Sequence, residues 1–286
     1  FYSESYRIYI FDCNFEEKQI TVKINYDNYT KEFILDNEIC EMKYDLTITT
    51  CFKDDYKKFP MWYDYYIKQG VEHFYMYYNG KLTDDIKNTL NKPNVTLHEW
   101  NYPYWSPFGG RLHFAQLGQI QHALYKYGKD NSDYMIFCDL DEFLYLKENI
   151  KLIDKLKSEK PDQIAFNNLW AKLIEDYIPN KLPEKFYIDK RNKLCPGRRK
   201  GICKTCKINS SSVHEAECQT NIFLDDDIKK YPDITSKTNR IRHCDIKKSL
   251  QGIMFHFKTS KEYQMGDSDS FSSLIYPDHN PFNEDY

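Results

Sequence analysis

The sequence predicts an α/β protein in which helices flank a mixed central sheet, with a small antiparallel β appendage at the N-terminus. The sheet is predicted because apolar runs too short for helices alternate with stretches of helical periodicity. The clearest run is Tyr134–Cys138, which is followed directly by Asp139, Asp141 and Glu142. Such a run is typical of a buried central strand, and open α/β sheets bind ligands at the carboxyl ends of these strands.

The appendage is predicted where apolar and polar residues alternate, through residues 6–11 and 19–24, with a turn at Asp27–Asn28. This period-two pattern indicates half-exposed antiparallel strands. The expected division of the chain is an N-terminal β appendage over residues 1–44 and a main α/β domain over residues 45–286.

The main domain is predicted to open with two strands around one helix. Leu46–Phe52 is the first inner strand, and residues 59–68 carry aromatic side chains at helical spacings of three and four. That spacing indicates a helix with one face in the core. Gly70 fits the position just after the helix end, and Val71–Tyr78 is the second strand.

Further elements continue the alternation. Helices are predicted at 84–90, 114–127 and 150–158, and strands at 95–100, 163–170 and 206–213. The stretch 103–112 contains two Gly, Pro and aromatic residues, which favours a loop that moves over a ligand. Residues 180–245 are predicted to be rich in loops, and most of the basic residues within 190–207 are expected to form a solvated face.

Asp139 and Asp141 are the first candidate site residues. In an extended chain, residues i and i+2 point to one face, and a bend beyond the strand brings both carboxylates towards one cation. Two hard oxygen ligands suit Mg²⁺ or Mn²⁺. The pattern therefore predicts a metal-bridged site for a nucleotide diphosphate.

Three further segments, residues 45–51, 61–79 and 254–263, stand in the order of a known family. Together with the Asp-Leu-Asp-Glu-Phe motif at 139–143 they resemble glycosyltransferase family 92 and its GT-A relatives. That pattern has a first strand, a helix with an aromatic face, a Gly-Val-aromatic strand ending in Tyr-x-Asn, the acidic motif, and a late His-aromatic-basic-x-Ser. The resemblance covers about residues 45–263 and implies a GT-A-like, Rossmann-like fold.

The resemblance implies a metal-dependent glycosyltransferase that uses Mn²⁺ or Mg²⁺. Its leading donor is UDP-galactose, with inversion, and its acceptor is a glycan or glycoprotein. Related GT-A enzymes use xylose, glucose or N-acetylglucosamine from UDP-sugars. A phosphohydrolase would need Thr or Val where Phe143 stands. A non-catalytic sugar-binding relative is the other alternative, against which the intact set of Asp139, Asp141 and His256 argues.

Donor-binding residues follow partly from the resemblance. It implies that Thr50 and Lys53 lie near uracil and ribose, and that Gln116 and Arg111 hold ribose or phosphate; an Arg can bind phosphate oxygens through two parallel hydrogen bonds. Asn79 is a candidate for the nucleoside because it follows a strand end, although Asn-Gly is also a turn signal. Lys53 and Arg111 fit solvated surface positions as well.

His256 and Lys258 are predicted to close the site. Alternation along residues 252–258 places both on one side, with His256 as the third metal ligand, where the family carries its late His, and Lys258 at the diphosphate. His214 is the rival ligand. The alternative is that His256 starts a helix and Lys258 lies on the surface.

An inverting transfer needs a carboxylate base. Glu215 and Asp176 are equal candidates, and Glu175 is the third. The family's usual sequence after Trp170 is replaced here by residues 171–177, which leaves the base and the acceptor open.

Composition limits the classes of partner and the cellular compartments that we expect. A net charge of −3 gives no reason to expect nucleic acid. No apolar run approaches the ~18 residues of a membrane span, so membrane association would need an anchor that this stretch lacks. The expected location is the Golgi or secretory lumen for a cellular protein, and the host cytoplasm or virion-assembly site for a viral one. Among nine Cys, those at 195, 203, 206 and 218 favour disulfides or free thiols over zinc.

Overall fold

The computed structural model describes residues 19–26, 28–36, 43–105, 114–146, 150–173, 186–189, 195–211, 216–218, 246–248, 252–258 and 271–275. The strands are β1 (Gln19–Tyr26), β2 (Tyr29–Asp36), β3 (Tyr44–Phe52), β4 (His73–Tyr78), β5 (Val95–Glu99), β6 (Ser132–Phe137), β7 (Glu142–Leu146), β8 (Gln163–Leu173), β9 (Phe186–Asp189), β10 (Cys195–Lys204), β11 (Ile208–Ser211), β12 (Ala216–Cys218), β13 (Ile246–Lys248), β14 (Gly252–Lys258) and β15 (Phe271–Ile275). The helices are α1 (Phe59–Lys68), α2 (Asp84–Thr89), α3 (Phe114–Ala123), α4 (Lys129–Asn131) and α5 (Leu152–Glu159), with the short turns η1 (Tyr56–Lys58), η2 (Leu124–Gly128) and η3 (Thr205–Lys207).

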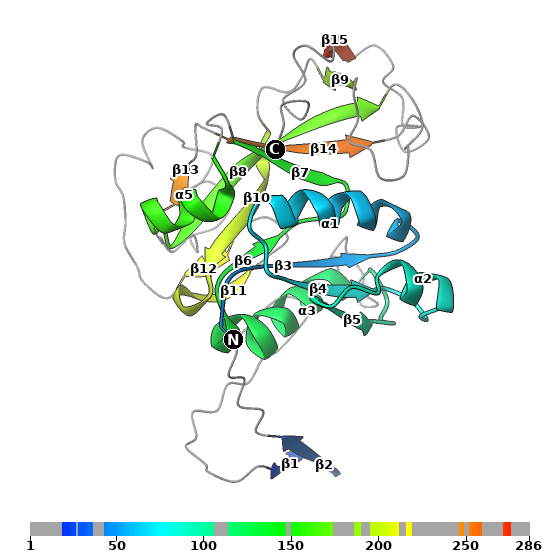
Figure 1. The fold of residues 1–286 in the computed structure, drawn as a ribbon. Helices are drawn as coiled ribbons and strands as arrows, with labels where there is room; N and C mark the ends of the chain where they lie inside the picture. Colours follow the sequence, from blue (N-terminus) through cyan, green and yellow to red (C-terminus); the bar gives the residue numbers. More distant parts are fainter. Residues whose placement is uncertain are drawn as a thin grey trace.

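One mixed sheet organises the described part of the chain (Figure 1). Its main path runs β15-β9-β8-β10-β6-β3-β4-β5, and β13 and β14 also pair with β8. Strands β6, β3, β4 and β5 run parallel to one another, whereas β10 is antiparallel to β6 and β8. Strand β7 joins this sheet through β14. The α/β class and the mixed sheet predicted from the sequence are therefore confirmed.

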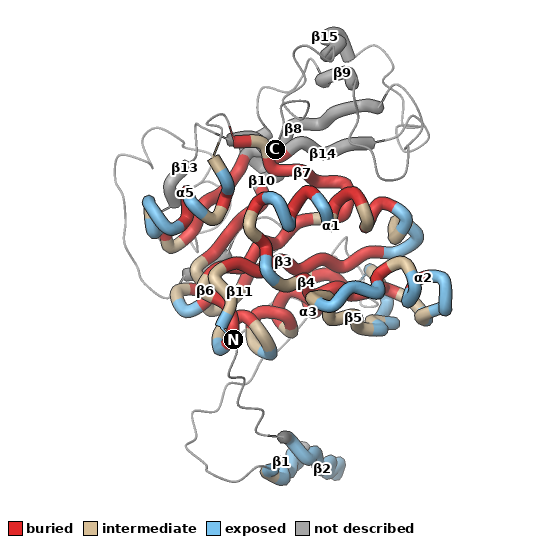
Figure 2. Tube along the Cα trace, in the orientation of Figure 1, coloured by how far each residue is buried: buried red, intermediate tan, exposed pale blue. Residues whose placement is uncertain are grey.

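The core lies on both faces of the parallel strands. Phe74 and Met76 of β4 pack in one apolar cluster with Trp62 of α1. The alternate residues Tyr75 and Tyr77 pack in a second cluster that includes residues of α3 and η2. Because both faces of β4 are covered, its sequence is continuously apolar and aromatic instead of alternating. Figure 2 shows β3 and β4 in the buried colour, between α1 and α3.

Local chemistry fixes the turn between α1 and β4. Gly70 has φ +94°, which side chains rarely allow, and a Cβ there would lie 2.4 Å from Cγ2 of Ile153. The predicted role of Gly70 at the helix end is therefore confirmed. Helix α2 begins after Thr83, whose hydroxyl accepts a hydrogen bond from the backbone N–H of Ile86.

Some boundaries differ from the sequence prediction. The helix predicted over residues 114–127 ends as α3 at Ala123 and continues as the π-helical turn η2. The strand predicted over residues 206–213 begins only at Ile208, after η3. The other predicted main-domain strands and helices correspond to described elements with ends that differ by a few residues.

Part of the predicted N-terminal appendage is described. Strands β1 and β2 form their own antiparallel two-stranded sheet, with Val22 opposite Phe33. Several of its apolar residues are exposed, Ile34 most of all, and Figure 2 colours most of this sheet as exposed. Within the described residues, no helix is both long and apolar enough to cross a membrane.

Candidate functional site

A cleft opens where β3, β4 and β6 end, at the edge that open α/β sheets use for ligands. It has a volume of about 430 Å³. Its lining residues come from the end of β3 and from the segments after these strands and after β5: Cys51, Phe52, Lys53, Asp55, Asn79, Tyr104, Asp139, Leu140 and Asp141. The fold thus brings both aspartates of the acidic motif to one cleft.

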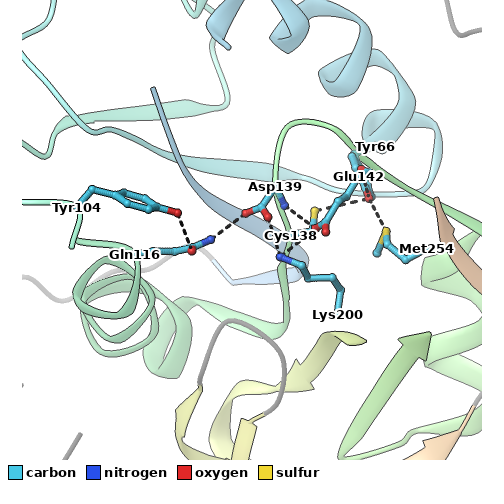
Figure 3. Close-up of polar contacts among 8 residues, drawn as sticks. All are labelled: Tyr66, Tyr104, Gln116, Cys138, Asp139, Glu142, Lys200 and Met254. Atoms are coloured by element: carbon cyan, nitrogen blue, oxygen red, sulfur yellow. Dashed lines mark hydrogen bonds and ion pairs between the residues drawn. The ribbon is translucent and has the colours of Figure 1, made fainter. Parts of the chain in front are cut away.

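Asp139 is held in the cleft by two donors (Figure 3). The Gln116 side chain donates a 2.8 Å hydrogen bond from Nε2 to Oδ1 of Asp139. The Lys200 ammonium lies 2.9 Å from Oδ2 of the same carboxylate. Tyr104 extends the chain of contacts by donating to Oε1 of Gln116 at 3.4 Å. Each oxygen of Asp139 therefore has a fixed partner in the protein.

Glu142 is a buried clamp across the motif. Its Oε2 atom accepts a 2.8 Å hydrogen bond from the backbone N–H of Asp139, and its own backbone N–H donates to the Asp139 carbonyl at 3.1 Å. The same Oε2 lies 3.1 Å from the Lys200 ammonium. Glu142 thus holds the turn that presents Asp139 and Asp141 through two hydrogen bonds, one to the backbone N–H and one to the carbonyl of Asp139.

Lys200 is charged despite its burial. Burial alone would lower its pKa, but the attraction of Asp139 and Glu142 outweighs this and holds the pKa of Lys200 above its usual value. Lys200, whose side chain is 3% exposed, is an exception to the solvated face expected for most of the basic residues within 190–207. The reason is that β10 carries it into the sheet beside β6, with Gly201 opposite Phe137.

Several predicted donor residues have described positions. Lys53 and Asn79 line the cleft. Thr50 is only 2% exposed and does not line it; in the described part of the structure its hydroxyl has no hydrogen-bond partner. Gln116 is near the cleft through Asp139. The roles of these residues in donor binding stay predictions.

Other predicted residues lie outside the described residues: Arg111, Glu175, Asp176, His214 and Glu215. His256 and Lys258 are described through the backbone of β14 alone. Its register places His256 opposite Glu142 of β7 and beside Trp170 of β8. The backbone of His256 is thus paired with that of the acidic motif, and the roles of His256 and Lys258 stay predictions.

The family model for glycosyltransferase family 92 matches residues 47–272. The chain belongs to glycosyltransferase family 92. The resemblance seen in its motifs is therefore confirmed at the level of the family.

Two solved structures resemble the chain in part. Both are of the mannosyltransferase Ktr4p from S. cerevisiae: one matches with 10% identity and a TM-score of 0.27, covering 45% of this chain and 40% of that one. The other, in complex with GDP, matches with 11% identity and a TM-score of 0.25, covering 45% and 41%. The matches thus span well under half of the yeast chains. No curated protein matches this family 92 chain significantly.

The carboxylates in the cleft fit a divalent cation in their chemistry, because Mg²⁺ and Mn²⁺ prefer such hard oxygen ligands. A carboxylate offers about four lone-pair positions, so the bonds from Gln116 and Lys200 leave Asp139 able to accept more. Across the described residues, no three His, Cys, Asp or Glu side chains are grouped closely enough to hold a metal. Asp139 and Asp141 would therefore share a cation with His256, substrate oxygens or water.

Four cysteines of this family 92 chain, Cys51, Cys138, Cys203 and Cys206, are free thiols. Cys51 lines the cleft, and burial, aided by the charge of Asp139, raises its pKa to about 12. It is therefore a neutral thiol and no nucleophile. Cys203 is buried and Cys206 is exposed, and within the described residues they belong to no group of three metal-ligating side chains.

Three residues of the site were not found from the sequence: Glu142 as a clamp, Lys200 and Tyr104. Glu142 belongs to the motif, yet nothing in its spacing separates a ligand from a clamp. Lys200 carries one signal, since it directly precedes the apolar segment Gly201–Cys203. A Lys that abuts a buried strand needs a carboxylate partner, and the motif supplies two.

Proposed function

We propose that this family 92 enzyme transfers galactose from UDP-galactose, with inversion, to a hydroxyl group of a glycan or glycoprotein. The observation that carries the proposal is the cleft in which Lys53, Asn79, Asp139 and Asp141 meet at the carboxyl edge of parallel strands. A donor with a uracil, a ribose and a diphosphate needs this combination of neutral polar, cationic and acidic groups along one groove.

The uridine end of the donor binds near Asn79 and Lys53, with Thr50 on the strand behind them. The Asn79 amide donates from Nδ2 to the carbonyl oxygens of Trp100 and Tyr102, at 2.9 and 2.8 Å. Because both amide hydrogens are used there, Asn79 offers a ligand its acceptor Oδ1. An acceptor suits the N3–H of uracil, which supports a uridine nucleotide.

The diphosphate end binds beside the acidic motif. Asp139, Asp141 and His256 hold Mn²⁺ or Mg²⁺ in this proposal, and the cation offsets the charge of the leaving nucleotide. Lys258 and Arg111 contribute positive charge to the phosphates. Asp139 enters the reaction already oriented by its two protein partners, which lowers the cost of ordering it when the donor binds.

The acceptor hydroxyl is deprotonated by one of three carboxylates: Glu215, Asp176 or Glu175. Alanine at the true base lowers turnover sharply while UDP affinity is kept, because the base does not touch the nucleotide. If all three single variants kept near-normal rates, the base would be another residue or the reaction would retain configuration.

A screen of nucleotide sugars tests the function directly. The purified chain is incubated with Mn²⁺ and each of UDP-galactose, UDP-glucose, UDP-xylose and UDP-N-acetylglucosamine, and nucleotide release is measured with and without glycan acceptors. UDP-galactose is expected to give the highest rate. Faster release from another UDP-sugar would replace the donor assignment, and metal-independent release would remove the cation from the proposal. A lack of release from every donor would contradict the proposed reaction.

A further inference from the structure

Lys200 sits behind the cleft, where its ammonium contacts two carboxylates of the acidic motif. Its ammonium lies 2.9 Å from Oδ2 of Asp139 and 3.1 Å from Oε2 of Glu142. The Asp139 side chain is 33% exposed, whereas those of Lys200 and Glu142 are 3% and 1% exposed. Figure 3 shows the ammonium between the two carboxylates. Lys200 does not line the cleft, so it acts on a bound ligand through Asp139.

The charges around Asp139 determine how Lys200 affects the binding of a cation. Asp139, Asp141 and Glu142 place three carboxylates within four residues, and Lys200 offsets one of those charges from inside the protein. A divalent cation that approaches Asp139 is repelled by the ammonium on its other oxygen, and little water screens that repulsion at a buried site. A diphosphate adds negative charge and oxygen ligands at the same place.

We propose that Lys200 is a positioning residue that fixes Asp139 and offsets its charge, so that the cleft binds a free divalent cation weakly and the cation together with a nucleoside diphosphate strongly. This inference rests on the proposed function, because it assumes that the cleft receives a diphosphate. It also implies an order of binding. The cation binds strongly only once the nucleotide is present, because the diphosphate supplies the remaining oxygen ligands.

A purely structural ion pair is the alternative. Lys200 would then stabilise the turn around Glu142 without influence on metal binding. The two roles differ in the affinity for Mn²⁺ measured without any nucleotide. An ion pair that only stabilises the fold changes the melting temperature when it is removed and leaves that affinity as it was.

The test compares Lys200→Met with the wild-type chain. Mn²⁺ binding is measured by calorimetry or by the electron paramagnetic resonance signal of free Mn²⁺, first without nucleotide and then with UDP. Loss of the ammonium is expected to strengthen binding of free Mn²⁺ by about tenfold or more, since one positive charge next to Asp139 is gone. The gain in Mn²⁺ affinity caused by UDP is expected to shrink correspondingly.

Lys155→Met is the matched control. Lys155 is equally buried, with a side chain 3% exposed, and it pairs with Glu159 at 2.8 Å on α5. Its removal deletes a buried lysine from an ion pair away from the cleft lining. Mn²⁺ affinity is expected to stay at the wild-type value. A Lys200→Met variant that is folded and binds free Mn²⁺ no more tightly than Lys155→Met overturns the proposal.

A second pair of variants keeps the test decisive if Lys200→Met does not fold, because that variant leaves Glu142 buried without its cation. Glu142→Gln alone is compared with Glu142→Gln combined with Lys200→Met. Neither leaves an unpaired charge at position 142, and the two differ only in the ammonium beside Asp139. The combined variant is expected to bind free Mn²⁺ more tightly; equal affinities would overturn the inference.

The wild-type measurements separate this inference from the proposed function. Mn²⁺ bound equally well with and without UDP would overturn the role of Lys200 and leave the transferase reaction standing. Mn²⁺ bound in neither condition, while the chain still transfers sugar, would overturn both this inference and the metal dependence. Nucleotide release from a UDP-sugar remains the separate check on the reaction itself.

Discussion

The Tyr66 hydroxyl donates a hydrogen bond to the backbone carbonyl of Glu142 at 3.1 Å, which joins helix α1 to the acidic motif. The same hydroxyl accepts from the Cys138 thiol at 3.6 Å and lies 3.9 Å from the sulfur of Met254 (Figure 3). The neighbouring Tyr65 hydroxyl donates to the carbonyl of Leu144. Two consecutive tyrosines thus fasten the start of β7 to a helix.

Removal of the Tyr66 hydroxyl tests how much its bond from α1 to the acidic motif contributes to the free energy of unfolding. We expect Tyr66→Phe to lower the free energy of unfolding by about 1–2 kcal/mol, because a buried carbonyl loses a donor. Tyr63→Phe is the control on the same helix: its hydroxyl donates to Asn94 at a half-buried position. Urea denaturation of both variants measures the difference. A loss no larger than that of Tyr63→Phe would contradict the role given to Tyr66.

Asp141 is expected to be needed for donor binding. Asp141→Ala should lower transfer by on the order of 10²-fold, because the charge of the leaving diphosphate loses part of its stabilisation. UDP with Mn²⁺ should raise the melting temperature of the wild-type chain and not that of the variant. Asp133→Ala is the control, since Asp133 forms a surface ion pair with Lys43 at 3.0 Å. Equal stabilisation by UDP in Asp141→Ala would show that the cleft binds donor without this carboxylate.

Gln116 is expected to affect metal and donor binding by orienting the Asp139 carboxylate. Loss of its 2.8 Å hydrogen bond in Gln116→Ala frees one carboxylate oxygen to turn, and a lost orienting partner typically lowers metal affinity or activity about 10- to 100-fold. Gln119→Ala is the matched control on α3, because Gln119 donates to Thr49 within the core. We expect the control to lower stability and keep the Kd for UDP and Mn²⁺. Calorimetry decides between them, and an unchanged Kd in Gln116→Ala would oppose the prediction.

Gly70 is expected to tolerate no side chain. Gly70→Ala should lower the free energy of unfolding by about 2 kcal/mol or more, from left-handed backbone strain and from the contact with Ile153. Gly128→Ala is the comparison, because Gly128 has helical φ −62° and a Cβ there would meet its nearest neighbours at 3.3 Å. Thermal and urea denaturation measure both. Comparable losses at the two positions would mean that backbone strain at Gly70 is minor.

The stability of the fold should fall as the pH drops below neutrality. His122 lies in an aromatic cluster and accepts or donates a 2.7 Å hydrogen bond with the Tyr77 hydroxyl. Burial, His98 and Lys126 lower its pKa to about 4, from an ordinary value of 6.5. As the pH falls, His122 therefore takes up a proton in the unfolded chain before it does so in the folded chain. The free energy of unfolding keeps its full contribution from neutral His122 above pH 6.5 and loses it as the pH falls towards 4.

His122→Gln removes this titration. We expect the wild-type chain to lose on the order of 2 kcal/mol between pH 7 and pH 4 through this residue, and the variant to lose correspondingly less. Urea midpoints across that pH range measure the slope. His73→Gln is a weaker comparison, since burial lowers the pKa of His73 without a neighbouring cation. Identical slopes in wild type and His122→Gln would assign the acid sensitivity to other groups.

The sequence predicted the parts of the site that depend on local patterns. Apolar runs that end in Lys53, Asn79 and Asp139 become neighbouring strand ends, because parallel strands share a carboxyl edge. Gly70 was predicted because a helix end needs a left-handed residue. In each case, information within about ten residues was sufficient.

The contacts of Asp139 with Lys200 and Gln116 could not be predicted in the same way. Lys200 stands 61 residues after Asp139, and its place depends on the antiparallel pairing of β10 with β6. No pattern within β10 specifies that partner, since a basic stretch alone indicates a solvated face. Glu142 is part of the motif, yet the sequence does not show where its side chain points. Only the turn geometry shows that its carboxylate points inward to the Asp139 N–H.

The pairing of β7 with β14 has a consequence for biosynthesis. Tyr66 and Met254 touch although 188 residues separate them, and a ribosome delivers the N-terminal part first. The parallel half from β3 to β6 can pack before β10 and β14 exist, and during that interval Glu142 has no ammonium beside it. Such an unneutralised carboxylate resists burial, which keeps the nascent motif open to water. Slow translation between β7 and β10 therefore prolongs a state in which the acidic motif is hydrated.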